Sequence, residues 1–115
     1  MAIEGQIQAL LGALVSGRCY PVINTSTDIV SPYITFQVIA NSPETMVEAP
    51  EDIENRLIQI DIWAETYGTA KSFEKQVKAA MNAASFANAP VASQDLYEAV
   101  SKEYRVLMEY SVWST

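Results

Sequence analysis

The stretch RLIQIDIWAETYGTAKSFEKQVKAAM, residues 56–81, changes its hydrophobic period halfway along. In residues 56–64, alternate positions are apolar, as one face of a β-strand requires: Ile58, Ile60, Ile62 and Ala64. Beyond them, apolar residues recur at intervals of three and four, as on one side of a helix: Ala70, Phe73, Val77, Ala80, Met81 and Ala84. Thr66 or Thr69 can cap that helix, and Gly68 permits a tight turn before it. The stretch therefore predicts a strand over 56–64, a turn, and a helix over 68–84.

The composition of the chain limits what it can do. The chain has 115 residues, half of them hydrophobic, and a formal net charge of −7. This length suits one core, so we expect a single domain over residues 1–115. The negative charge disfavours binding to nucleic-acid phosphates. Cys19 is the only cysteine, which excludes an intrachain disulfide, and we expect it to be a small buried hydrophobic residue.

The N-terminal segment has helical spacing over residues 3–15 and meets a helix-ending glycine at Gly17. Polar residues interrupt it, and it is shorter than a membrane span. We therefore expect a packing helix, no contact with a membrane, and function in a cytoplasm.

The remaining elements are predicted to be strands, and residues 33–40 alternate most clearly, with Ile34, Phe36, Val38 and Ala40 on one face. The predicted further strands are 19–23, 33–40, 91–100 and 104–113. The predicted connections are 24–32, 41–55, 85–90 and a hairpin turn at 101–103. Together with the two helices, this order predicts an α+β fold, a mostly antiparallel β-sheet with two α-helices packed on one face. The predicted core residues are Ile34, Phe36, Val38, Ile58, Ile60, Ile62, Phe73, Val77, Val106, Met108 and Val112.

The chain offers little chemistry for catalysis. It has no histidine, the most adaptable proton-transfer group. Asp61 and Glu109 could form a paired acid site, but we expect them to be solvated or salt-bridged on the less buried face of the sheet. The glycines form no phosphate-binding loop, and residues 48–54 lack the ligand spacing of a calcium loop. We therefore expect no catalytic residues, no metal site and no cofactor.

Bulky apolar residues remain on the second face of the strands: Leu57, Trp63, Leu107 and Trp113. Exposed apolar patches often mark protein interfaces, and tryptophan is a favoured anchor in them. Two interpretations stay open here, since these residues could form an interface or complete a second small core.

Several segments, in order, resemble the tail-completion, or tail-terminator, proteins of long-tailed bacteriophages. They are YITFQV at 33–38, IQIDIWAETY at 58–67 after an acidic loop, the helix that runs to Ala80 and Met81, and YRVLMEYSVW at 104–113. The strand, turn and helix of residues 56–81 correspond to the middle of that family's core.

This resemblance implies a structural role in a virion, at the junction between tail and head, after assembly in the cytoplasm of a bacterial host. Such proteins form a ring, of six subunits, that caps the tail tube, ends its polymerisation and joins the tail to the head. The implied partners are other copies of this chain, the tail-tube protein, and a head-completion or connector protein. DNA passes through the channel without specific binding.

Alternatives remain open. A head-completion (neck) protein would have a similar role on the head side. A small α+β ligand-binding or enzymatic domain would use Asp61, Glu109 and nearby tyrosines in a pocket, and a cellular adaptor would bind its partner through the edge of the sheet.

The predicted interface candidates come from the acidic connection and from the second face of the sheet: Met46, Val47, Glu48, Glu51, Asp52, Trp63 and Trp113. Residues 41–55 contain two prolines, several acids and few large apolar groups, so alone they bury too little to offset the entropy of ordering them. We expect this connection to become ordered when subunits or the tail tip dock against it. The alternative is a solvated connection with no further role.

Overall fold

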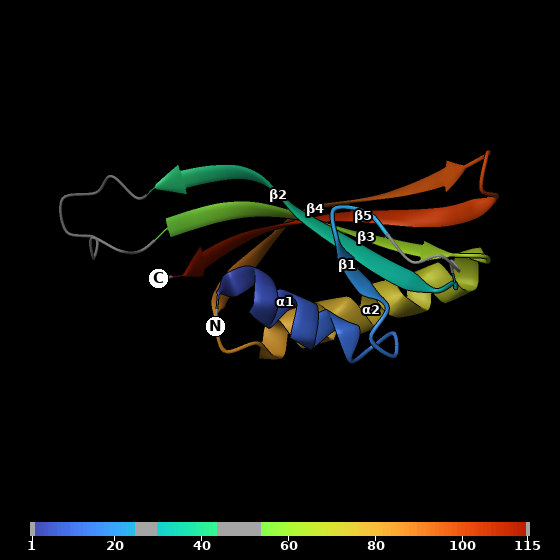
Figure 1. Cartoon of the computed structure of the whole chain (residues 1–115). Coiled ribbons are helices and arrows are strands. Elements are labelled where there is room, and N and C mark those ends of the chain that lie inside the picture. The colour runs from blue at the N-terminus through green and yellow to red at the C-terminus, as the bar shows by residue number, and fades with distance from the viewer. Residues whose placement is uncertain (1, 25–29, 44–53, 115) are drawn as a thin grey trace.

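The structure, a computed structural model, describes residues 2–24, 30–43 and 54–114. In these ranges, two helices lie on one face of a five-stranded sheet (Figure 1). In chain order the elements are α1 (Ile3–Gly12), β1 (Cys19–Pro21), β2 (Tyr33–Pro43), β3 (Glu54–Ala64), α2 (Tyr67–Ala83), β4 (Ala87–Glu98) and β5 (Glu103–Ser114). The strand order in the sheet is β1-β2-β3-β5-β4. The α+β prediction is confirmed, with β1 parallel to β2 and every other pair antiparallel.

The segment from β3 to α2 forms as predicted. Ile58, Ile60 and Ile62 are fully buried under the helices. The side chain of Thr66 accepts a hydrogen bond from the backbone N–H of Thr69 at 3.2 Å, which caps the first turn of α2. The spacing of buried apolar residues therefore changes from the two-residue period of a strand to the 3.6-residue period of a helix where the chain leaves the sheet.

Two predicted connections are wrong at their ends. β2 continues to Pro43 and β3 starts at Glu54, because Pro43 pairs with Glu54 across the β2–β3 hairpin. Strand therefore occupies both ends of the predicted connection 41–55. β4 begins at Ala87, so the predicted connection 85–90 is also partly strand. These residues do not alternate in polarity, and their pairing with β5 makes them a strand.

The first helix is shorter than predicted, because α1 ends at Gly12. The backbone N–H of Gly17 donates to the carbonyl oxygen of Gly12 at 2.8 Å. Gly17 has a φ of 83°, in the left-handed region that glycine enters readily. The residues after α1 therefore form turns, although Val15 is still buried. No helix in the described ranges is long and apolar enough to cross a membrane.

Strands β2 and β4 each carry a β-bulge. In β2 the register shifts between Val38 and Ala40, and in β4 it shifts between Pro90 and Ala92. The extra residue in β2 is Ile39, whose side chain is exposed. A bulge moves the following residues to the other face, so Ala40 is exposed and its predicted place on the inner face is wrong.

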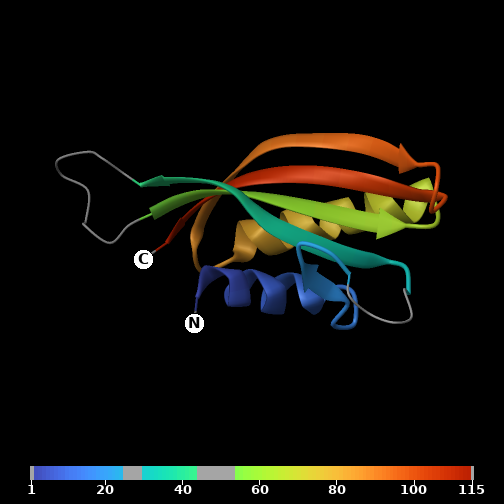
Figure 2. The ribbon, with the colours of Figure 1, turned by 45° about the horizontal axis from the view of Figure 1, so that its top comes forward.

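The core lies between the helices and the sheet (Figure 2). Of the predicted core residues, all but two are buried, and Val38 and Phe73 are partly buried against the others. Cys19 is buried as predicted, and burial raises the pKa of its thiol to about 12. The apolar stripe of α1 adds Ile3, Ile7 and Leu11 to this core.

Candidate functional site

The sheet has one face that neither helix covers (Figure 2). We call it the open face, and it consists of alternate residues of the two central strands. In β3 and β5 these residues are Leu57, Gln59, Asp61, Trp63, Arg105, Leu107, Glu109, Ser111 and Trp113. Most of them are partly buried, because large side chains lie against one another across the strands. The predicted second face of the strands is therefore the open face.

Trp63 is held by its neighbours on this face. Its ring stacks on Tyr33, with centroids 5.8 Å apart and planes 9° from parallel. Its Nε1–H donates to Thr35 Oγ1 at 3.1 Å. The Arg105 guanidinium carbon lies 4.9 Å from the centroid of the same ring, within the range of a cation–π interaction. Trp63 therefore has a fixed orientation within the subunit.

Arg105 also joins two carboxylates. Its Nε donates to Asp61 Oδ1 at 2.9 Å, and its Nη1 donates to Glu98 Oε1 at 3.0 Å. Gln59 Nε2 donates to the other oxygen of Asp61 at 2.8 Å. Burial alone would lower the pKa of Arg105, but Asp61 and then Glu98 raise it above its ordinary value. The guanidinium therefore stays charged beside the two acids.

These contacts decide between the two roles considered for Asp61. Its side chain is only 7% exposed, and each carboxylate oxygen already accepts a hydrogen bond. Of the two expected states, solvated or salt-bridged, Asp61 has the second, and Arg105 is its partner. Glu109 is partly buried and lies opposite Gln59. Within the described residues, no group of three or more acidic or cysteine side chains is arranged to hold a metal ion.

The two predicted tryptophans lie at opposite ends of the open face. Trp63 pairs with Arg105 in the β3–β5 register, whereas Trp113 pairs with Asn55. Eight residues of β5 separate these levels, or about 26 Å at the rise of an extended strand. The structure therefore does not bring the two tryptophans together. The other predicted interface residues, Met46, Val47, Glu48, Glu51 and Asp52, lie outside the described residues.

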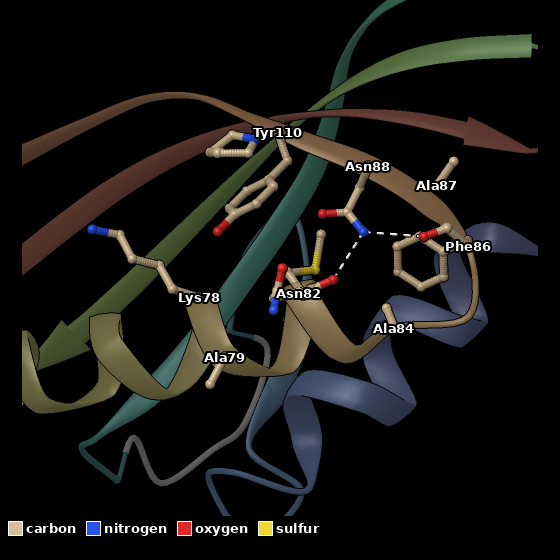
Figure 3. Close-up of a pocket in the computed structure, with 10 residues that line it drawn as sticks. Lys78, Ala79, Asn82, Ala84, Phe86, Ala87, Asn88 and Tyr110 are labelled. Atoms are coloured by element: carbon tan, nitrogen blue, oxygen red, sulfur yellow. Dashed lines mark hydrogen bonds between the residues drawn. The ribbon is translucent and has the colours of Figure 1, made fainter.

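A second surface was not predicted from the sequence. It is a pocket of about 620 Å³ between the last turns of α2 and the first half of β4 (Figure 3). Its lining residues are Lys78, Ala79, Met81, Asn82, Ala84, Phe86, Ala87, Asn88, Pro90 and Tyr110. A hollow of about 290 Å³ extends it along β4 and shares Lys78, Pro90 and Tyr110 with it. We call these two spaces together the α2–β4 groove.

The groove is mainly apolar, with a few polar groups. Asn88 Nδ2 donates to the carbonyl oxygens of Met81 at 2.9 Å and Phe86 at 3.1 Å (Figure 3). The Met81 carbonyl lies at the end of α2 and also accepts from the backbone N–H of Ala84 at 3.3 Å. The Tyr110 hydroxyl points into the pocket (Figure 3), and burial, followed by the negative charge of Glu74, raises its pKa. The groove can therefore hold an apolar group beside a hydrogen-bonding one.

Side-chain bridges hold the far end of the groove at a fixed width. Ser93 Oγ in β4 donates to Glu74 Oε2 in α2 at 2.5 Å. Lys71 Nζ lies 2.7 Å from Glu74 Oε1 and 3.0 Å from Asp95 Oδ1. Burial would raise the pKa of Glu74, but the bonds from Lys71 and Ser93 lower it below its ordinary value. The sequence signal for the groove is the run of small residues at the start of β4, which leaves space above α2.

The chain resembles known proteins both in sequence and in fold. Residues 4–115 match the sequence model of a family described as tail completion protein gp17. A chain in a structure described as the virion of a native gene transfer agent particle has the same fold, with a TM-score of 0.61 and 14% sequence identity. The match covers 91% of this chain and 84% of that chain. None of the curated proteins matches this sequence.

Proposed function

Because this chain belongs to the tail completion protein gp17 family, we propose that it forms a ring that caps the tail tube of a bacteriophage or prophage. The ring ends polymerisation of the tube and provides the surface that joins the tail to the head. The observation that carries this proposal is the family match, which runs from residue 4 to residue 115. The matched range includes nearly the whole of every helix and strand.

The proposed assembly is a hexamer of identical copies. The two edges of the sheet differ, since one is the short strand β1 and the other is the 12-residue strand β4. A contact between two different surfaces of neighbouring copies repeats in one direction and can close into a ring. This asymmetry is compatible with a cyclic assembly, and six is the number that the family resemblance implies.

The proposed partners are the tail-tube protein on one side of the ring and a head-completion or connector protein on the other. DNA passes through the opening without specific binding. The net charge of −7 supports that part of the proposal, because an acidic channel repels phosphates. The proposed location is the junction of tail and head in the virion, after assembly in the host cytoplasm.

The proposed contact residues fall into two groups. The first group lies in the acidic connection: Met46, Val47, Glu48, Glu51 and Asp52. The second group consists of Trp63 and Trp113, one at each end of the open face. The fixed orientation of Trp63 supports its role, because an anchor that is already ordered loses little entropy when a partner binds.

Deletion of the gene from its phage or prophage tests the proposal. We expect the deletion to leave filled heads and separate tail tubes of irregular length, and we expect the wild-type gene supplied from a plasmid to restore joined particles. Electron microscopy of the lysates measures both outcomes. Tail tubes of normal length and with closed ends in the deletion strain, together with heads that lack a connector component, would favour a head-completion protein instead.

A further inference from the structure

Charge is unevenly distributed along this chain. Three of its seven basic residues lie on α2, namely Lys71, Lys75 and Lys78. Residues 44–53, between β2 and β3, contain four acidic residues and no basic one: Glu44, Glu48, Glu51 and Asp52. Copies with a net charge of −7 repel one another, so an interface between them is most favourable where basic groups meet an acidic segment.

One of these basic groups, Lys78, lines the α2–β4 groove. The Lys78 side chain is 53% exposed and lines both parts of the groove. The carboxylate nearest to it is that of Glu74, with an N–O distance of 3.9 Å, and Glu74 is already bound more closely by Lys71. Lys75, one turn earlier on α2, is exposed and is not one of the residues that line the groove. Lys78 is therefore available to an occupant of the groove.

The groove also offers apolar surface. Met81, Phe86 and Tyr110 line it, and Pro90 and Val91 form its β4 side. Val91, the extra residue of the β4 bulge, is 56% exposed. An occupant that combines apolar side chains with carboxylates would match this lining and Lys78 beside it.

We propose that the α2–β4 groove binds residues 44–53 of a second copy of this chain. The segment ETMVEAPEDI has the required combination, with Met46 and Val47 between Glu44 and Glu48. In this proposal Met46 and Val47 meet the apolar part of the groove, and a flanking carboxylate pairs with Lys78. Because one surface of each copy contacts a different surface of the next, the same contact repeats around a ring.

This inference rests on the proposed ring and adds the surface that holds neighbouring copies together. It also accounts for two apolar residues in an acidic stretch, because Met46 and Val47 leave water when the next copy binds. The proposed partner is a second copy because the acidic segment and the apolar groove with Lys78 at its side are present in one chain.

Cross-linking between single-cysteine copies tests the contact directly. One preparation carries Val47→Cys and the other carries Ala79→Cys, which lies in the groove and is exposed. The native Cys19 gives little background, because it is buried and its thiol has a pKa of about 12. The two preparations are mixed, assembled on tail tubes and treated with a short bifunctional maleimide. We expect dimers that contain one copy of each kind.

Val100→Cys is the matched control. Val100 is fully exposed in the turn between β4 and β5, at the opposite end of β4 from Ala87. It should give few mixed dimers with Val47→Cys. Equal yields from both pairs would contradict the proposal, as would a cross-link from Ala79→Cys to the tail-tube protein. An internal cross-link in the Val47→Cys/Ala79→Cys double variant, without mixed dimers, would place residues 44–53 in the groove of their own chain and also overturn it.

A charge exchange gives a second test. Lys78→Glu should reduce ring formation at least tenfold, as measured by analytical ultracentrifugation or by negative-stain counts of capped tubes. Adding Glu48→Lys to the same chain should restore much of this loss, whereas Lys102→Glu in the β4–β5 turn should have little effect. Circular dichroism melting establishes that each variant is folded.

Failure of this inference can be distinguished from failure of the proposed function. If wild-type rings cap tail tubes but the groove gives no specific cross-link and Lys78→Glu caps normally, the proposed function stands and the groove contact is wrong. If the wild-type protein forms no ring on tail tubes, both proposals are wrong.

Discussion

Arg105 lies directly opposite Trp63 across the β3–β5 pair, and its guanidinium carbon is 4.9 Å from the centroid of the indole ring. The same guanidinium binds Asp61, the most buried acid on the open face. Arg105 therefore connects the aromatic stack of Trp63 to the ion pairs of Asp61 and Glu98. This arrangement makes the open face an ordered surface, although no helix covers it.

Removal of Arg105 should be costly for stability. Arg105→Ala leaves the Asp61 carboxylate buried without its counter-charge, and losses of about 3–5 kcal/mol are typical when one partner of a buried ion pair is removed. Urea denaturation measures the change. Arg56→Ala is the matched control, because its closest partner, Glu54, is half exposed and such surface pairs contribute only about 0–1 kcal/mol. Equal losses of stability at both positions would show that the buried Arg105–Asp61 pair contributes no more than a surface pair.

The core prediction concerns Ile60. Its side chain is fully buried between the sheet and the helices, so Ile60→Ala should cost about 2–5 kcal/mol through lost burial and a residual cavity. Phe73→Ala should cost less than a fully buried phenylalanine would, because Phe73 is only partly buried. Val100→Ala is the control and should change stability by less than about 0.5 kcal/mol. A similarly small loss at Ile60 would show that the inner face of the sheet is wrongly assigned.

The bridge from Glu74 to β4 predicts an effect of acid. The folded-state pKa of Glu74 is lower than its ordinary value of 4.5, so folding favours the ionised carboxylate. The stabilisation is complete above the ordinary pKa and is lost as the pH falls through the folded-state value. The free energy of unfolding should therefore fall below about pH 4.5, and in Glu74→Gln this fall should be smaller. If the free energy of unfolding of the variant falls with pH as it does in the wild type, Glu74 does not cause the acid sensitivity.

The buried thiol predicts slow chemical modification. Because burial raises the pKa of Cys19 to about 12, little reactive thiolate is present at neutral pH. We expect Ellman's reagent to react with Cys19 only at the rate at which the protein unfolds, and to react at once in concentrated urea. Rapid reaction in the native protein would show that β1 opens readily from the edge of the sheet.

Sequence patterns predicted most of the fold where the two sides of an element differ in their surroundings. Ile58, Ile60 and Ile62 alternate because one side of β3 faces the helices and the other does not. β4 is exposed over most of its length, so apolar residues are not required on either side of it. Its first residues, from Ala87, therefore show no alternation of apolar and polar side chains. The bulges at Ile39 and Val91 depend on the register of the partner strand, which one segment of sequence does not encode.

The candidate surfaces were predicted to different extents. Trp63 was placed on the correct face by alternation alone, but its contact with Arg105 depends on the β3–β5 register. The groove could not be predicted, because it arises where β4 passes over the end of α2 and Pro90 and Tyr110 meet Lys78 there. The roles of residues 44–53 and of both tryptophans in assembly stay predictions.

The central claim is that this chain ends the growth of a tail tube. Its most direct test is the length of tubes that purified tail-tube protein forms in the presence and absence of this chain, measured by negative-stain electron microscopy. We predict that adding the chain stops elongation and leaves a ring at one end of each tube, whereas Lys102→Glu behaves like the wild type. Tubes that continue to lengthen at the same rate, with no ring at either end, would contradict the claim.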